Sequence, residues 1–212
     1  MMPLGQQQTG MSQDSPLLSL VLLACAIWAS KLWLEDYRNR RQPKPGALPG
    51  ATAFTSLAIW IACTGAVLIV LVETLCESAA GLDAEQSTIA WHFLAAMVAA
   101  AAIEELVFRG YLVISGKGRA VLAGSALGFS MLFALAHPYL WTYENGDGLT
   151  LHLDSAKAWL TTGFLLLKSL WFYYARFARW NPHRSLLPCV AAHLAINLAT
   201  FGIKAAQGHV AW

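Results

Sequence analysis

The sequence has few charged residues. Only 12% of its 212 residues are Asp, Glu, Lys or Arg, whereas 57% are hydrophobic. The charged share is roughly half of the ~25% that is usual in soluble domains. This shortage argues against a soluble protein and indicates an integral membrane protein. The length suits one compact bundle and leaves no room for a second sizeable domain.

Cysteine pairs of the kind found in disulfide frameworks and zinc knuckles are also lacking. The chain has four cysteines, and none of them belongs to a C-x-x-C pair. They fall in or at the ends of apolar segments, so we expect small packing residues at these positions: Cys25, Cys63, Cys76 and Cys189. The sequence also contains no H-E-x-x-H motif, no internal repeat and no low-complexity tract.

Six apolar segments are long enough to cross a bilayer, which takes about 20 residues. The expected spans are 17–34, 51–76, 89–114, 119–137, 156–174 and 185–203. They predict an all-α fold, a polytopic transmembrane bundle of about six helices. The segment 42–50 is rich in proline and glycine, which predicts a helix-free linker. We therefore divide the chain into 1–50, an N-terminal tail with the first transmembrane helix and a basic linker, and 51–212, the core.

Lys and Arg are absent from every second loop. The loops 77–88 and 138–155 have none, and neither does the tail before Pro16, which therefore does not read as a signal peptide. The other three loops carry the basic residues Arg38, Arg40, Arg41 and Lys44, then Lys117 and Arg119, then Arg176, Arg179 and Arg184. The positive-inside rule predicts that these loops are cytoplasmic and both termini outside. We expect a prokaryotic inner membrane.

Against this apolar background, three ionisable residues stand inside the third expected span. A charged side chain near the bilayer centre costs about 2.5–3.5 kcal/mol on insertion scales, so such a cluster is a functional hypothesis by default. Glu105 and Arg109 are four residues apart, hence on one helix face, and can form an ion pair. Glu104 is rotated by about 100° from Glu105. We expect the arginine to hold Glu105 while Glu104 is presented to a cavity.

Two later spans offer histidines. Pro138 disfavours helical geometry in the residue before it, so His137 marks a helix end or a kink. His193 and Asn197 share a helix face. In a lipid-embedded bundle such groups converge on the core. At 1.5 Å per residue, Glu104 and His193 lie about 12–15 Å from the cytoplasmic face and His137 about 25 Å, so a tilt, a kink or a later helix start must bring His137 to the others.

Three motifs, in order along the chain, resemble those of a known family. The segment 104–111, EELVFRGY, looks like the E-E-x-x-x-R motif of the glutamic intramembrane proteases. These are the CAAX prenyl endopeptidases and bacteriocin-processing or bacteriocin-immunity proteins, also called the CPBP or Abi family. The segment 133–137, FALAH, is similar to the family motif F-x-x-x-H, and 193–197, HLAIN, is similar to H-x-x-x-N.

The resemblance implies an intramembrane endopeptidase whose active site lies in the bundle core. Its substrate would be a small membrane-associated protein with a CAAX-type end, a leader or a C-terminal sorting peptide. Glu104 would be the general base on a water held with help from His137. His193 and Asn197 would donate hydrogen bonds to the oxyanion, and Glu105 with Arg109 would orient the site.

This scheme needs neither a metal nor another cofactor. The expected partners are a peptide or protein substrate presented from the membrane and the lipid bilayer, with no nucleic acid. On the resemblance, residues 51–212 would be the protease core.

Three alternatives stay open. Glu104, His137 and His193 form a legitimate ligand set for a zinc-dependent variant of the protease. A non-catalytic binding or bacteriocin-immunity membrane protein could keep the polar core only to hold a partner. Proton or ion transport along the acids and histidines is physically possible, although the lack of broken-helix repeats counts against it.

The sequence also gives expectations for two charged residues in the spans and for the loop around residues 143–148. Lys168 in the fifth span is expected to snorkel toward the cytoplasmic headgroups, and Glu73, near a span end, needs no special role. The Asn-Gly and Asp-Gly steps within 143–148 favour tight turns. We expect an exposed loop there rather than a hairpin or a lid.

Overall fold

The computed structural model describes residues 15–144 and 148–212. Within these ranges six α-helices make up most of the fold: α1 (Pro16–Arg38), α2 (Ser56–Ala79), α3 (Phe93–Glu104), α4 (Arg119–Leu135), α5 (Ala156–Phe177) and α6 (Leu187–Ala206). A π-helical stretch, η2 (Glu105–Tyr111), continues α3, and two short 3₁₀ turns follow α2 and α4, η1 (Asp83–Glu85) and η3 (Pro138–Leu140). The helices fall on the six expected spans, so the predicted all-α bundle is confirmed.

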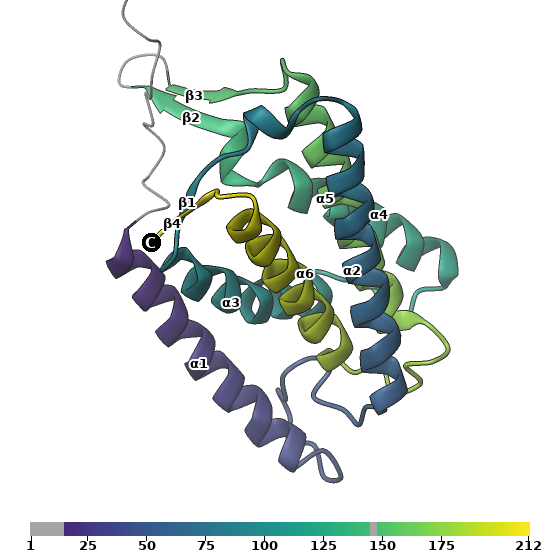
Figure 1. Ribbon diagram of the computed structural model, residues 1–212. Coiled ribbons are helices and arrows are strands. Elements are labelled where there is room, and N and C mark those ends of the chain that lie inside the picture. The colour runs from purple at the N-terminus through teal and green to yellow at the C-terminus, as the bar shows by residue number, and fades with distance from the viewer. Residues whose placement is uncertain (1–14, 145–147) are drawn as a thin grey trace, which may run out of the picture.

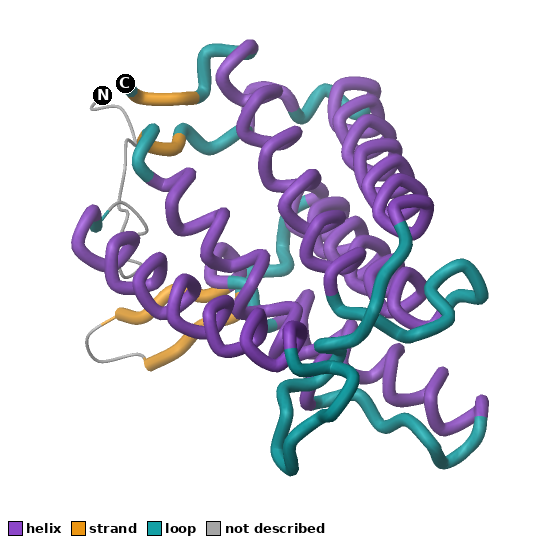
Figure 2. Tube along the Cα trace, turned by 90° about the horizontal axis from the view of Figure 1, so that it is seen from below, coloured by secondary structure: helices purple, strands orange, loops and turns teal. Residues whose placement is uncertain are grey.

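In the described part of the chain, four short strands lie at the margin of the helices (Figure 2). β1 (Ile89–Ala90) pairs in parallel with β4 (Val210–Ala211), and for this reason α3 begins four residues later than the predicted span. β2 (Trp141–Glu144) pairs antiparallel with β3 (Gly148–Leu151). The expectation of an exposed loop was therefore wrong. Aromatic and β-branched residues in β2 and β3 favour strand pairing. Asn145–Asp147 lie outside the described residues, as does the tail 1–14.

Hydroxyl side chains fix the beginnings of three helices. Ser15, Thr55 and Ser155 accept hydrogen bonds from the backbone N–H groups of Leu18, Ala58 and Ala158, at 3.4, 3.1 and 3.0 Å. Each bond satisfies one of the N–H groups that a helix N-terminus leaves without an intrahelical partner. The linker between α1 and α2 contains no helix, as its proline and glycine content predicts.

The helices pack as a series in which α6 is central. α6 crosses the middle of the bundle with α2 on one side and α3 on the other (Figure 1). α1 packs on α3, and α4 packs on α5, which in turn contacts α2 and α6. The groups carried by α3, α5 and α6 are thereby brought to the centre.

Three helices are long and apolar enough to cross a membrane in the described part of the chain, namely α1, α2 and α6. α4 is apolar but shorter. α5 is long and carries several basic residues. Large apolar side chains such as Leu17, Trp28, Trp60 and Leu75 are exposed on α1 and α2. Such contiguous apolar surfaces suit contact with lipid rather than with water.

Small residues allow α2 to approach α5 and α6 closely. Ala58, Ala62 and Ala66 recur at every fourth position of α2 and are fully buried. Trp171 on α5 donates its indole N–H to the carbonyl of Ala62 at 2.9 Å. Its ring lies against Gly65, where an added Cβ would come within 2.1 Å of the Trp171 ring. Small residues at helix interfaces are typical of membrane bundles.

Two ion pairs join α2 to α5 away from this seam. Glu73 pairs with Lys168 and Glu77 pairs with Lys157. Gln86 donates to Glu77, and Lys204 on α6 donates to Gln86. The expectation that Lys168 snorkels to the cytoplasmic headgroups was wrong. The Glu73 carboxylate pairs with the Lys168 ammonium inside the bundle, so the charge is compensated without contact with water.

We expect Gly65→Ala to destabilise the protein by about 1–3 kcal/mol, because the new methyl group overlaps the Trp171 ring. Thermal unfolding in detergent measures this. Gly163→Ala on α5 is the matched control, since an added Cβ there meets nothing within 4 Å. The control is expected to be neutral or slightly stabilising. Equal melting temperatures for the two variants would contradict the packing at Gly65.

Candidate active site

The site begins with a fully buried ion pair. Glu105 and Arg109 are both 0% exposed, and Arg109 Nη1 donates to Glu105 Oε1 at 3.0 Å. Arg109 Nη2 also donates to the carbonyl oxygen of Ser169 at 3.1 Å and to the Ser169 hydroxyl. That hydroxyl donates to Ser130 Oγ at 2.9 Å. The ion pair expected from the spacing is present, and it ties η2 to α5 and α4.

Aromatic rings enclose the guanidinium of Arg109. Its Cζ lies 4.8 to 5.7 Å from four ring centroids, those of Phe108, Phe133, Phe172 and Tyr173. A cation over aromatic faces is attracted by about 0.5–2 kcal/mol per contact. Phe133 belongs to the F-x-x-x-H motif, but sequence reasoning missed the other three rings and also Ser130 and Ser169. The serines had a signal, because hydroxyls inside apolar spans commonly bond across helices, whereas the other rings had none.

The backbone that carries the ion pair is π-helical. The N–H of Leu112 bonds to the carbonyl of Val107, five residues back, at 2.9 Å. The Tyr173 hydroxyl donates to the carbonyl of Phe108 at 2.7 Å. π-helical turns are rare and occur frequently at functional sites. Here the turn starts at Glu105 and ends just beyond Arg109.

His193 lies between the two glutamates. Its Nδ1 is 2.9 Å from Glu105 Oε1 and its Nε2 is 3.9 Å from Glu104 Oε2. Since Glu105 is already paired with Arg109, its oxygen is an acceptor, and we assign the proton on His193 to Nδ1. The Phe172 ring stacks on the imidazole, with centroids 4.9 Å apart. Four groups thus form one line: Arg109, Glu105, His193 and Glu104.

The two adjacent carboxylates have different surroundings. The side chain of Glu104 is 34% exposed, whereas that of Glu105 is 0% exposed. This difference follows from the helical rotation between neighbouring residues. It agrees with the prediction that Arg109 holds Glu105, and the presentation of Glu104 to a cavity stays a prediction.

His137 reaches the cluster through Phe133. α4 ends at Leu135, and His137 is in extended geometry with φ −68° and ψ 131°, as Pro138 predicts. Its Nδ1 lies 2.8 Å from the Phe133 carbonyl, so Nδ1 carries the proton and Nε2 is an acceptor. The Phe133 ring meets both imidazoles, with centroids 4.8 Å from His137 and 6.3 Å from His193. His137 is thus linked to His193 through the Phe133 ring, and its approach to Glu104 stays a prediction.

Asn197 holds α6 to α3. Its Nδ2 donates to the carbonyl oxygen of Met97 at 2.8 Å. Met97 precedes Glu104 on the same helix. The second N–H of the amide and its Oδ1 stay available for another partner.

The arrangement does not favour the zinc alternative. Over residues 15–144 and 148–212, no three His, Cys, Asp or Glu side chains are grouped as a metal ion would need. The set Glu104, His137 and His193 is thus not gathered as ligands.

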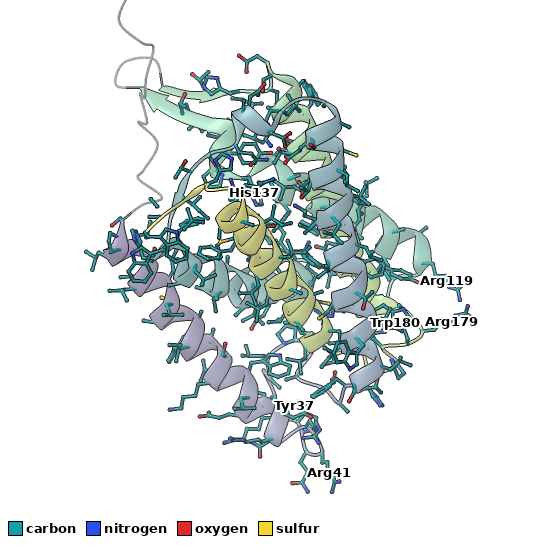
Figure 3. The ribbon with its side chains drawn as sticks, viewed as in Figure 1. Tyr37, Arg41, Arg119, His137, Arg179 and Trp180 are labelled. Atoms are coloured by element: carbon teal, nitrogen blue, oxygen red, sulfur yellow. The ribbon has the colours of Figure 1, made fainter. Side chains whose placement is uncertain are left out.

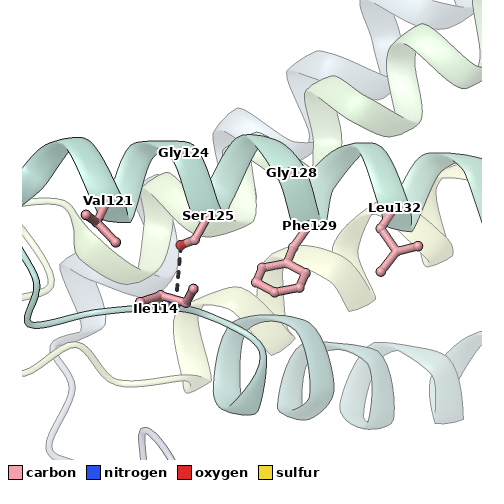
Figure 4. A pocket seen from close by; sticks show the side chains of 7 residues that line it. All are labelled: Ile114, Val121, Gly124, Ser125, Gly128, Phe129 and Leu132. Atoms are coloured by element: carbon pink, nitrogen blue, oxygen red, sulfur yellow. Dashed lines mark hydrogen bonds between the residues drawn. The ribbon is translucent and has the colours of Figure 1, made fainter.

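A separate hollow of about 440 Å³ lies along α4 and contains none of these residues. Ile114 and one face of α4 from Val121 to Leu132 line it, and the Ile114 N–H donates to Ser125 Oγ at 3.3 Å (Figure 4). Gly124 and Gly128 leave this face open. The hollow is therefore a surface groove along α4 and not the cavity of the site.

A family model described as type II CAAX prenyl endopeptidase Rce1-like matches residues 86–199, more than half of the chain. The match takes in all seven defining residues of the three motifs. The chain belongs to this family. A search of curated proteins and a search of solved structures found no match. As a member of the Rce1-like family, the chain is an integral membrane protein of a protease family, and α1 and α2 lie outside the matched residues.

We expect Arg109→Met to destabilise the protein by about 3–5 kcal/mol, because it leaves the Glu105 carboxylate buried without its ion-pair partner. Thermal unfolding in detergent compares this variant with Glu105→Gln and with the double variant. The double variant should be destabilised by less than the sum of the two single changes, since no lone charge stays behind. Strictly additive losses would contradict the coupling.

Proposed function

We propose that this Rce1-like protein is a glutamic-type intramembrane endopeptidase. Its substrate would be a membrane-associated protein with a CAAX-type C-terminus, and a leader or a C-terminal sorting peptide is the related option. One observation carries the proposal: Glu104, partly exposed, faces the imidazole of His193, which Glu105 and Arg109 hold from behind. We also propose 51–212 as the protease core and a prokaryotic inner membrane with both termini outside.

Glu104 is the general base in this scheme. A base must reach both water and substrate, and Glu104 is exposed enough to do so, whereas Glu105 is sealed. Glu104 accepts a proton from water as the water oxygen attacks the scissile carbonyl. It then returns the proton to the departing amine, so the peptide bond breaks and the protons balance. His137 helps to hold the water, because its Nε2 is an acceptor.

His193 and Asn197 stabilise the oxyanion. With Nδ1–H directed at Glu105, His193 donates from Nε2 only as an imidazolium, and the carboxylate of Glu105 stabilises that positive charge. Asn197 contributes its second amide N–H, since the first is bonded to Met97. Glu105 thus acts on the reaction through His193, in addition to its pairing with Arg109.

The first test is Glu104→Gln in purified protein reconstituted into liposomes, with a prenylated peptide that ends in a free carboxylate. Release of the C-terminal fragment should fall by about 10²-fold or more, because the amide cannot accept the proton. The melting temperature should stay close to that of the unaltered protein. Glu85→Gln, the same change at an exposed position in η1, is the matched control and should cleave normally. Full cleavage by Glu104→Gln would refute the assignment, and binding of the peptide without any cleavage by the unaltered protein would favour the immunity or binding role.

The second test separates the glutamic from the zinc mechanism. Treatment with 1,10-phenanthroline or EDTA, followed by gel filtration, should leave the cleavage rate unchanged. Added Zn²⁺ should not raise it. A loss of activity that Zn²⁺ alone restores would show that Glu104, His137 and His193 hold a metal in the working enzyme.

A further inference from the structure

Several arginines lie toward one end of the bundle. Arg41, Arg119 and Arg179 lie toward this end, whereas His137 lies toward the opposite one (Figure 3). α1 exposes apolar side chains from Leu17 to Leu34, and Arg38, Arg40 and Arg41 follow directly. A lipid-facing helix that ends in arginines places them at the level of the lipid headgroups.

A pocket opens at this level between three separate parts of the chain. It has a volume of about 450 Å³ and is lined by Arg40, Arg41, Thr52, Ala53 and His183. The first two residues follow α1, the next two precede α2, and His183 belongs to the loop between α5 and α6. Two arginines and a histidine thus line one pocket, and none of its lining residues is acidic.

The walls of the pocket are held in place by hydrogen bonds. The Thr52 hydroxyl donates to the carbonyl of His183 at 2.8 Å. The N–H of Leu186 bonds to the Gly50 carbonyl at 3.0 Å. Asn181, 1% exposed, donates to the carbonyls of Ala175 and Ser185 at 3.0 and 2.9 Å. The loop that carries His183 is therefore bound both to itself and to the linker, so the pocket is largely pre-formed.

The Arg40 side chain is held by Tyr37 of α1. Its Nη1 donates to the Tyr37 carbonyl at 2.9 Å, and its Cζ lies 4.2 Å from the centroid of the Tyr37 ring. A guanidinium has five N–H donors in a rigid fork, which leaves others for a ligand. Asp36, the nearby acid on α1, is occupied by the Leu48 N–H at 2.8 Å. Arginine forks match phosphate oxygens in pairs.

We propose that this pocket binds the phosphate group of an anionic lipid headgroup. The ligand chemistry follows from the paired guanidiniums, and the lipid source follows from their position at the end of a lipid-facing helix. The bound lipid joins the end of α1 and the linker to the α5–α6 loop. Arg40, Arg41 and Thr52 lie before the family match and His183 within it. The site is distinct from the catalytic residues, and its test needs no substrate.

The experiment uses the full-length protein in neutral detergent after removal of lipid, with added phosphatidylglycerol, phosphatidylcholine or inorganic phosphate. Native mass spectrometry measures lipid binding, and thermal unfolding measures stabilisation. Phosphatidylglycerol should bind tightly and raise the melting temperature, whereas phosphatidylcholine and inorganic phosphate should do neither. Arg40→Gln/Arg41→Gln should weaken phosphatidylglycerol binding by about 30-fold, the worth of two arginines near a lipid surface. Arg41→Gln alone, which leaves the contact between Arg40 and Tyr37 in place, should give an intermediate loss.

Lys117→Gln/Arg119→Gln is the matched control, because it removes two exposed basic charges around the start of α4, toward the same end. It should bind phosphatidylglycerol like the unaltered protein. An equal loss in the control would show diffuse surface charge and overturn the proposal. Equal binding of phosphatidylcholine would overturn it as well. If inorganic phosphate raised the melting temperature as much as phosphatidylglycerol did, the ligand of the pocket would be free phosphate and the lipid proposal would be overturned.

Discussion

The buried positive charge of Arg109 is the constraint around which the centre of the protein is arranged. Neither lipid nor water solvates a guanidinium that is 0% exposed, and such a charge must be met by partners inside the bundle. Glu105 supplies the opposite charge, Ser169 supplies oxygen acceptors, and aromatic rings close the remaining faces. Because Ser169 belongs to α5 and Glu105 also accepts from His193 of α6, one arginine fixes three segments of the chain relative to each other.

This arrangement assigns unequal surroundings to two identical side chains. Glu105 has Arg109 on one side and His193 on the other, so its negative charge serves to hold these two side chains in place. Glu104 is the neighbouring residue, but its side chain points in a different direction. It lies near the other nitrogen of the same imidazole, Nε2 of His193, and is partly exposed. A paired acid behind the histidine and an accessible one in front of it form an asymmetric site that a single carboxylate could not provide.

The sequence was sufficient for features that depend on local periodicity. The six helices, the pairing of Glu105 with Arg109 and the end of α4 before His137 all follow from residues within a few turns of each other. It was insufficient where distant residues meet. Nothing in the sequence around Lys168 indicates that it forms an ion pair with Glu73, 95 positions earlier. Nor does the sequence around Ser169 indicate that this residue accepts hydrogen bonds from Arg109. The hairpin and the β1–β4 pair also depend on partners whose distance in space cannot be read from spacing. The roles of the site residues in catalysis remain predictions.

In lipid, apolar surface gives helices little reason to associate, so close backbone approach and polar contacts decide which ones hold together. In this protein the polar contacts are not spread evenly. Ion pairs tie α2 to α5, while His193 and Asn197, on the same face of α6, both bond to the segment that carries the acids, at Glu105 and Met97. The seam between α3 and α6 is therefore held by the same residues that would do the chemistry. Any displacement of α3 along α6 would break the hydrogen bond of His193 before it disturbed the apolar packing, so the position of the acids and the structure of the seam are fixed by one set of contacts.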